Sequence, residues 1–217
     1  MFNELYRILY DHYGDLKWWP SSSDDETVIG CILTQNTSWK NVEKSIINLK
    51  NNGLLNLNAI KNMDAEILKK YIMPSGFYNQ KAVYLKNIAD AVIDSYGTLD
   101  NMKNRDIKNI SNFLKNIKGV GQETLDSIML YALNYPVFVV DAYTKRFLKR
   151  YYNQNFTFDM IQNYALNDLK KDISMLKNLH AMIVELSKTY CKSTPQCSEC
   201  FLRTGCKYHN SIKNSDR

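Results

Sequence analysis

Leu114-Lys115-Asn116-Ile117-Lys118-Gly119-Val120-Gly121-Gln122-Glu123-Thr124 is the stretch of sequence that decides the fold. Two glycines that flank one apolar residue allow the backbone to turn tightly and to approach a partner closely. The apolar residues on both sides recur at helical spacing, so the stretch predicts two helices joined by a hairpin. The N–H groups at the start of the second helix would suit a DNA phosphate. The same pattern also serves as a plain turn between two helices.

The rest of the chain is also helical in its periodicity, which predicts an all-α fold. Pro136–Val140 is the one run that resembles a strand, and because it is isolated we interpret it as a short buried connector. No run of eighteen apolar residues occurs, which excludes a membrane span. The net charge of +6, from 28 basic and 22 acidic residues, permits a polyanionic partner without requiring one.

Asp141 stands at the end of the apolar run Phe138-Val139-Val140, eighteen residues after Glu123. A carboxylate in this position has two ordinary uses. It can cap the helix that is expected to begin at Ala142, or it can be a catalytic group. For an isolated aspartate the helix cap is the more common of the two.

Four of the five cysteines lie in the last 27 residues, as Cys191-x5-Cys197-x2-Cys200-x5-Cys206. Thiolates at this spacing can converge on one inorganic centre, and two disulfides are the alternative. The opening Met1-Phe2-Asn3-Glu4 carries no leader for export, so we expect a cytoplasmic protein without disulfides. Four cysteines suit zinc or a [4Fe-4S] cluster. The loops are longer than the paired knuckles of a zinc ribbon, which favours iron and sulfur.

The hairpin glycines, Val139-Val140-Asp141 and the cysteine loop together resemble the endonuclease III branch of the helix–hairpin–helix DNA glycosylases. Leu33-Thr34-Gln35-Asn36-Thr37 is similar to the early Gln-containing loop of that family. Gly76-Phe77-Tyr78-Asn79-Gln80-Lys81-Ala82 is similar to its Gly-Leu-Tyr-Asn-x-Lys-Ala segment. The first cysteine gap is five residues, where endonuclease III usually has six, and such a change in a loop should not prevent cluster binding.

This resemblance implies two α-helical lobes with a cleft that receives the damaged base, and with Asp141 and Glu123 at its mouth. The expected lobes are 22–134, which contains the hairpin at about 112–134, and 1–21 plus 135–217, which contains the iron–sulfur loop 191–206. The implied partner is double-stranded DNA with a damaged base. We expect a monomer, associated with the nucleoid if the source is prokaryotic.

Glu123 is the important departure from the family. Bifunctional members carry a lysine at this place, whose amine attacks the sugar to form a Schiff base, and a carboxylate cannot do so. The resemblance therefore implies a monofunctional glycosylase followed by a separate abasic-site endonuclease. Asp141 would stabilise the oxocarbenium-like sugar and orient or deprotonate the attacking water.

Three alternatives to that reading remain open. One is an endonuclease III-type enzyme for oxidised pyrimidines with strand cleavage, although Glu123 argues against the cleavage. Another is a mismatch glycosylase for thymine or uracil, which would also lack the lysine. The third is a non-catalytic DNA-binding protein that keeps the scaffold, which an intact Asp141 disfavours.

Trp18-Trp19-Pro20 resembles the endonuclease III-like 3-methyladenine glycosylases. Trp18 and Trp19 would form an aromatic wall for an electron-poor methylated purine, with core packing as the alternative. Gln35 would fill the gap left by the flipped base, or else cap a helix end. Phe77 would wedge into the opposite strand, or else belong to the core. The residues Gly119, Val120 and Gly121 would contact the DNA backbone.

Overall fold

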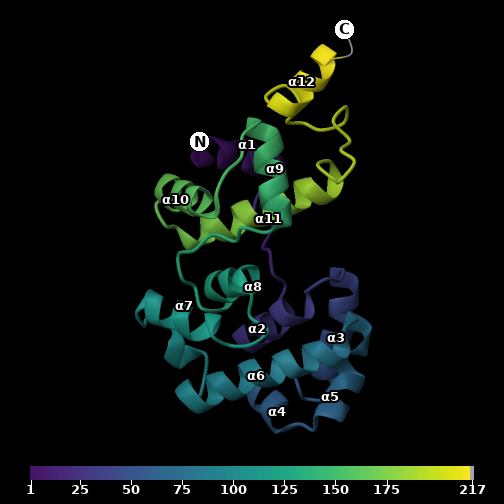
Figure 1. The fold of residues 1–217 in the computed structure, drawn as a ribbon, viewed down its shortest axis with the longest axis vertical. Coiled ribbons are helices and arrows are strands. Elements are labelled where there is room, and N and C mark those ends of the chain that lie inside the picture. The colour runs from purple at the N-terminus through teal and green to yellow at the C-terminus, as the bar shows by residue number, and fades with distance from the viewer. Residues whose placement is uncertain (216–217) are drawn as a thin grey trace. The chain divides into compact units, whose positions relative to one another are not determined.

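The structure is a computed structural model that describes residues 1–215, and within them it is helical, with no β-strand (Figure 1). The all-α prediction is confirmed. The chain forms two compact units: Met1–Trp18 joins Pro136–Arg217 in unit 1, and Trp19–Tyr135 forms unit 2. In the described part of the chain, no helix combines the length and apolar character needed to cross a membrane.

Unit 2 is built around the helix α2, which is buried over most of its length. Every residue of α2 from Glu26 to Leu33 is buried, because neighbouring helices of the unit pack against it. The α-helices of the unit are α2 (Asp24–Leu33), α3 (Trp39–Asn51), α4 (Leu57–Asn62), α5 (Ala65–Ile72), α6 (Tyr78–Tyr96), α7 (Ile107–Lys115) and α8 (Gln122–Ser127). Its other turns are the 3-10 helices η1 (Met73–Ser75) and η2 (Asp100–Met102) and the π-helical η3 (Ile128–Ala132).

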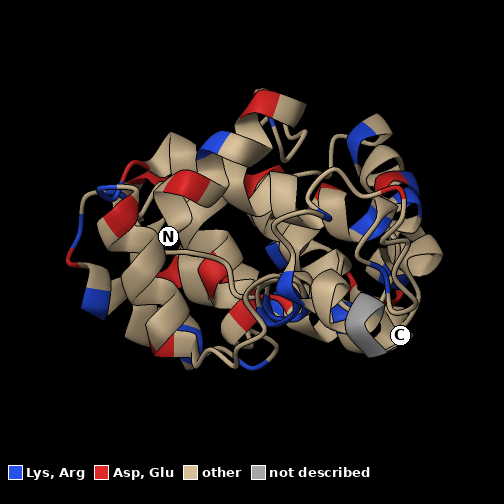
Figure 2. Cartoon of the chain, turned by 90° about the horizontal axis from the view of Figure 1, so that it is seen from above, with Lys and Arg blue, Asp and Glu red and all other residues tan. Residues whose placement is uncertain are grey.

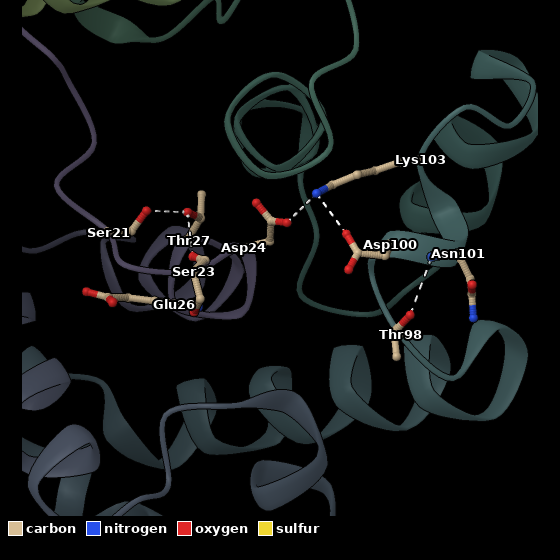
Figure 3. A network of polar contacts seen from close by, with 9 residues as sticks. All are labelled: Ser21, Ser23, Asp24, Glu26, Thr27, Thr98, Asp100, Asn101 and Lys103. Carbon is tan, nitrogen blue, oxygen red and sulfur yellow. Dashed lines mark hydrogen bonds and ion pairs between the residues drawn. The ribbon is translucent and has the colours of Figure 1, made fainter.

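Polar side chains fix the N-terminus of α2. The hydroxyl of Ser23 accepts the N–H of Glu26 at 3.1 Å, and the carboxylate of Glu26 accepts the N–H of Ser22 at 2.9 Å. This reciprocal arrangement satisfies backbone donors at the helix start that would otherwise lack partners. Figure 3 shows a further contact at this helix start, in which the Lys103 ammonium bridges the carboxylates of Asp24 and Asp100. The start of α2 is therefore capped by side chains next to it, and Lys103 also links it to Asp100 of η2.

The hairpin is fixed against α6 at Gly119, whose φ of +107° is one that side chains rarely adopt. A Cβ atom at this position would lie 2.3 Å from the Cγ of Tyr84. Ile117 and Val120 point inward and are buried, which anchors the turn on its apolar side. Gly121 differs, because a Cβ atom there would meet nothing within 4 Å. Gly119 thus allows the hairpin to pack against Tyr84 of α6, whereas the space beside Gly121 is open.

Unit 1 contains α1 (Phe2–Tyr13), α9 (Ala142–Tyr152), α10 (Phe158–Asp168), α11 (Ile173–Thr189) and α12 (Lys207–Ser215). Its core is centred on Phe138, which is fully buried and meets the ring of Phe2 edge to face at 6.0 Å. The Gln162 side chain binds both the N–H and the carbonyl of Phe138. A side chain thus replaces the neighbouring strand that this extended segment lacks, and the interpretation of 136–140 as a buried connector is confirmed.

Charges of both signs are interspersed along the helices and loops, as Figure 2 shows. The formal net charge of +6 is therefore not an argument for any particular DNA-binding face. Such a face has to be argued from the hairpin and the loops near it.

We expect Gly119→Ala to lower the free energy of unfolding by about 2–4 kcal/mol, because it adds both backbone strain and overlap with Tyr84. Urea denaturation measures this change. Gly121→Ala is the matched control and should lower stability by about 1 kcal/mol or less, since φ is negative and the space is open, and only the N-cap preference of glycine is lost. Equal losses in the two variants would contradict the assignment.

Candidate active site

The hairpin turn exposes polar groups while it buries its apolar ones. Lys118, Gly121, Gln122 and Glu123 are exposed. Glu123 lies in the first turn of α8, where a carboxylate is favourable to the positive end of the helix dipole. The turn therefore presents backbone groups, one lysine and one carboxylate to the outside. Contact with a phosphate is accordingly easier at the exposed Gly121 than at the buried Val120.

Gln35 is bound to the hairpin in this structure. Its side-chain amide donates to the carbonyl of Gly119 and to the hydroxyl of Thr124, both at 3.0 Å. The loop that carries Gln35 follows directly after α2, and Asn36 within it has a φ of +52°. Sequence reasoning offered a role in DNA or a helix cap. The structure adds a third feature, which is that this glutamine links its own loop to the helix–hairpin–helix turn.

Phe77 is 64% exposed, so the alternative that it belongs to the core is wrong. It is also the N-cap residue of α6 and has left-handed backbone angles, φ +48° and ψ +30°. A bulky residue adopts this conformation at a cost of about 1–2 kcal/mol, so the surrounding turn must hold it there. An exposed aromatic ring on a fixed turn is the form expected of a residue that inserts into a base stack.

Asp141 caps α9, as one of its two predicted uses requires. Its Oδ1 accepts the N–H of Thr144 at 2.6 Å, and its Oδ2 lies 3.4 Å from Nε2 of His180 on α11. Both Asp141 and His180 are buried, with exposures of 7% and 5%. The two residues lie 39 positions apart along the chain, so sequence spacing does not predict this contact.

Two opposing effects act on the pKa of Asp141. Burial raises it, whereas His180 and the N–H of Thr144 lower it, and the net pKa lies below the ordinary value of 3.8. The carboxylate is therefore ionised at neutral pH although it is buried. An ionised carboxylate at a helix N-terminus, with a histidine beside it, can stabilise positive charge or orient a water molecule.

The adjacent tryptophans have different surroundings. Trp18, in unit 1, has the Lys188 ammonium 4.8 Å from its ring centroid. Trp19, in unit 2, has a φ of +70° and contacts α2 at Gly30, where a Cβ atom would lie 3.4 Å from its ring. Trp39 and Tyr131 lie beside Trp19, with ring centroids at 5.6 and 5.2 Å. Trp19 is thus a half-buried member of an aromatic cluster, and only Trp19 of the predicted pair belongs to it.

All four cysteines of the C-terminal loop are free thiols that line one pocket. Side chains of α9 and α11 complete its wall, among them Phe147, Arg150 and Leu186. Within residues 1–215 no three His, Cys, Asp or Glu side chains are placed so that they could hold a metal ion. The thiols therefore share one pocket without being drawn together on one atom.

Two arginines of α9 hold the start of this loop. Arg146 donates to the carbonyl of Cys191 at 2.8 Å, and Arg150 donates to the carbonyl of Ser193 at 2.9 Å. Arg150 also lies 3.5 Å from the sulfur of Cys191. At the far end of the loop, the Cys206 thiol lies 3.8 Å from the carbonyl of Arg150. Both ends of the cysteine loop therefore contact α9, the helix that Asp141 caps.

Two buried titratable groups in unit 2 were missed by sequence reasoning. Lys81 is 2% exposed, and burial lowers its pKa to about 8. Asp126 on α8 is 3% exposed, and burial raises its pKa to about 7, although the amide of Gln122 donates to its Oδ1 at 2.9 Å. The helical pattern placed both near apolar positions, but only the packing shows that they are enclosed.

Comparison with known proteins places this helix–hairpin–helix scaffold with its buried aspartate in one family. The family model described as the HhH-GPD superfamily of base excision DNA repair proteins matches residues 29–179. The chain belongs to this family, and it is therefore a DNA glycosylase that acts on DNA in base excision repair.

Individual relatives and solved structures match most of this chain. A protein of Methanocaldococcus jannaschii that is provisionally named a DNA repair glycosylase is 44% identical over 95% of this chain and 96% of its own. The structure of H. pylori 3-methyladenine DNA glycosylase bound to 1,N6-ethenoadenine has a TM-score of 0.76 and 29% identity, and covers 86% of this chain and 96% of that one. A non-covalent endonuclease III–DNA complex shares the fold, with a TM-score of 0.80, 19% identity and coverage of 98% and 97%.

The raised pKa of Asp126 gives a testable pH dependence. Its pKa in the folded protein is above the ordinary 3.8, so the folded state holds the proton more tightly, and this stabilisation is lost as the pH rises towards and past 7. Between pH 5 and pH 8 the natural protein should therefore lose about 1–3 kcal/mol of its free energy of unfolding through Asp126. Asp126→Asn should not show this loss. Urea denaturation at the two pH values measures this. Asp11→Asn, at an exposed position on α1, is the control and should keep the loss, and its absence there would contradict the prediction.

Proposed function

We propose that this protein is a monofunctional DNA glycosylase that removes alkylated purines such as 3-methyladenine. The observation that carries the proposal is the buried, ionised Asp141, which is held by the N–H of Thr144 and by His180. A carboxylate of this kind stabilises the positive charge that develops on the sugar as the base departs. It can also orient the water that completes hydrolysis, and accept its proton.

The absence of a lysine at position 123 supports the monofunctional part of the proposal. Glu123 is exposed on the first turn of α8, at the place where bifunctional members of the endonuclease III branch carry a lysine. A carboxylate cannot form the Schiff base that leads to strand cleavage. The product is then an intact strand with an abasic site, which an abasic-site endonuclease has to process.

The aromatic cluster around Trp19 supports an alkylated purine as the substrate. Methylation leaves the purine electron-poor and often cationic, and such a ring stacks well on the electron-rich face of an indole. The H. pylori relative, a 3-methyladenine glycosylase, matches this chain over most of its length. The glycosidic bond of such a base is already weak, so base flipping and one well-placed carboxylate suffice.

Gln35 and Phe77 would maintain the DNA after the base has flipped out. The exposed ring of Phe77 would enter the base stack, and Gln35 would occupy the gap. Gln35 would have to exchange its hydrogen bonds with Gly119 and Thr124 for bonds with DNA, or else contact DNA while it keeps them.

A [4Fe-4S] cluster in the cysteine pocket is the second part of the proposal. Four free thiols that share one pocket are the donor set of such a cluster. Cys191, Cys197, Cys200 and Cys206 would be the ligands. Bound there, the cluster would supply a structural cross-link within the loop that follows α11.

Release of bases from methylated duplex DNA tests the function directly. We expect the purified protein to release free 3-methyladenine, with strand breaks that appear on a gel only after alkali. Breaks without alkali would contradict the monofunctional assignment. Release of oxidised pyrimidines or mismatched thymine in its place would refute the substrate, and no release from any damaged duplex would favour a DNA-binding protein without activity.

Asp141→Asn should slow base release by about a hundredfold or more, because the charge that stabilises the sugar is lost. Asparagine caps helices as well as aspartate does, so folding and DNA binding should persist. Single-turnover release and binding to undamaged duplex separate the two effects. Asp172→Asn is the matched control, since Asp172 is an exposed aspartate that caps α11 in the same unit. A fully active Asp141→Asn protein would refute the catalytic role.

Metal analysis tests the cofactor. We expect about four iron and four acid-labile sulfide atoms per chain in protein purified without oxygen. Cys206→Ser should lose iron, whereas Cys31→Ser, at a buried position outside the loop, should retain it. One zinc ion per chain in place of iron would contradict the assignment.

A further inference from the structure

Lys81 places an ammonium group inside unit 2 without a carboxylate partner. Its Nζ donates to the carbonyl of Leu33 at 2.8 Å and to the carbonyl of Ser75 at 2.7 Å. No ion pair of the described residues includes it, and only 2% of the residue is exposed. Burying an ammonium is costly, as its lowered pKa of about 8 reflects, and a methionine would fill similar space at less cost. A specific use for the two hydrogen bonds would account for that cost.

The two carbonyls lie at the bases of two different loops. Leu33 is the last residue of α2, and the loop with Gln35 begins immediately after it. Ser75 is the last residue of η1, and Gly76 and Phe77 follow it. One ammonium therefore fixes the distance between the bases of the two loops that carry Gln35 and Phe77.

Lys81 also holds the Phe77 turn through its backbone. Its N–H donates to the carbonyl of Phe77 at 3.0 Å, while its side chain holds Ser75 on the other side of Gly76. The hydroxyl of Ser75 adds a bond to the carbonyl of Ile72 at 2.7 Å. These bonds enclose the residue with the unfavourable left-handed angles, so they can keep Phe77 exposed and prevent it from relaxing inward.

We infer that Lys81 is a positioning residue that keeps the Gln35 loop and the Phe77 turn at a fixed spacing, so that both can enter the DNA in one step when the base leaves the stack. This inference rests on the proposed function. It assigns Lys81 no contact with DNA. Its effect is to supply the rigid frame that two separate loops need in order to act together.

Lys86 provides a matched control on the same helix. It too is a lysine of α6 that donates to two backbone carbonyls, those of Lys61 and Met63. Those carbonyls lie at the end of α4 and just beyond it, and neither belongs to the Gln35 loop or the Phe77 turn. Lys81→Met and Lys86→Met therefore remove the same kind of contact, and only the first removes it from the two loops.

Amide hydrogen exchange of the full-length protein tests the frame independently of any activity. Lys81→Met should accelerate exchange by about tenfold or more in both 34–37 and 76–80, because the loss of a charged donor releases both carbonyls together. Lys86→Met should leave both segments unchanged. Acceleration in only one segment, or in neither, would overturn the inference. If Lys81→Met does not fold, Lys81→Gln, which retains a donor, should show the same paired effect at smaller size.

Single-turnover base release from methylated duplex then tests the consequence. We expect Lys81→Met to slow release by about tenfold, with binding to undamaged duplex changed by less than about twofold, while Lys86→Met behaves as the natural protein does. Equal rates in the two variants would overturn the inference. If the natural protein itself releases no base, the proposed function fails, and the exchange experiment still decides whether Lys81 couples the two loops.

Discussion

The ring of Tyr84 and any side chain at residue 119 cannot occupy the same space, and the arrangement of unit 2 depends on this constraint. Because residue 119 is glycine, the hairpin can lie directly against α6, where Asn87 adds a bond to the carbonyl of Lys118 at 3.0 Å. Lys81 stands one helical turn before Tyr84, and residues at this spacing lie along one side of a helix. The N–H and the ammonium of Lys81 donate to the carbonyls of Phe77 and Ser75, so the same residue also holds the turn that precedes the helix. One stripe of α6 therefore sets the Phe77 turn, the Gln35 loop and the hairpin in order.

In unit 1 a pair of helices, α9 and α11, sets the positions of the buried polar residues and of the cysteine loop. α9 carries Asp141 at its N-terminus, and α11 carries the histidine beside it. The same two helices wall the cysteine pocket, and Arg146 and Arg150 of α9 bind the backbone where the cysteine loop begins. A group that drew the four thiols together would restrain the far ends of both helices. The cysteine loop can thus influence the position of Asp141 without contact with DNA or with the reacting sugar.

The features that the sequence predicted are those that depend on local pattern. Helical spacing, the turn at Gly119 and Gly121, and the cap at Asp141 follow from residues that are near one another in the chain, and each is present. Features that depend on distant neighbours were not predictable. The contact of Asp141 with His180 spans 39 positions, and Lys81 meets the carbonyl of Leu33 across 48. The two hairpin glycines look equivalent in the sequence, and only the position of Tyr84 separates the inward one from the outward one.

Ionisable side chains are buried in both units of this fold, and they make polar contacts there. Lys81, Asp126 and Asp141 are each enclosed, and each bears a pKa that burial has moved or opposed. At Lys81 and Asp126, where burial opposes the charged form, apolar residues of similar size would cost less to bury. Asp141 keeps its charge only because Thr144 and His180 offset the loss of water, and a carboxylate held in this way needs little reorganisation when positive charge develops near it. Under the proposed function, the offset burial of Asp141 is therefore the source of the chemistry, and the stability that unit 2 gives up at Lys81 serves to keep two loops at a fixed spacing.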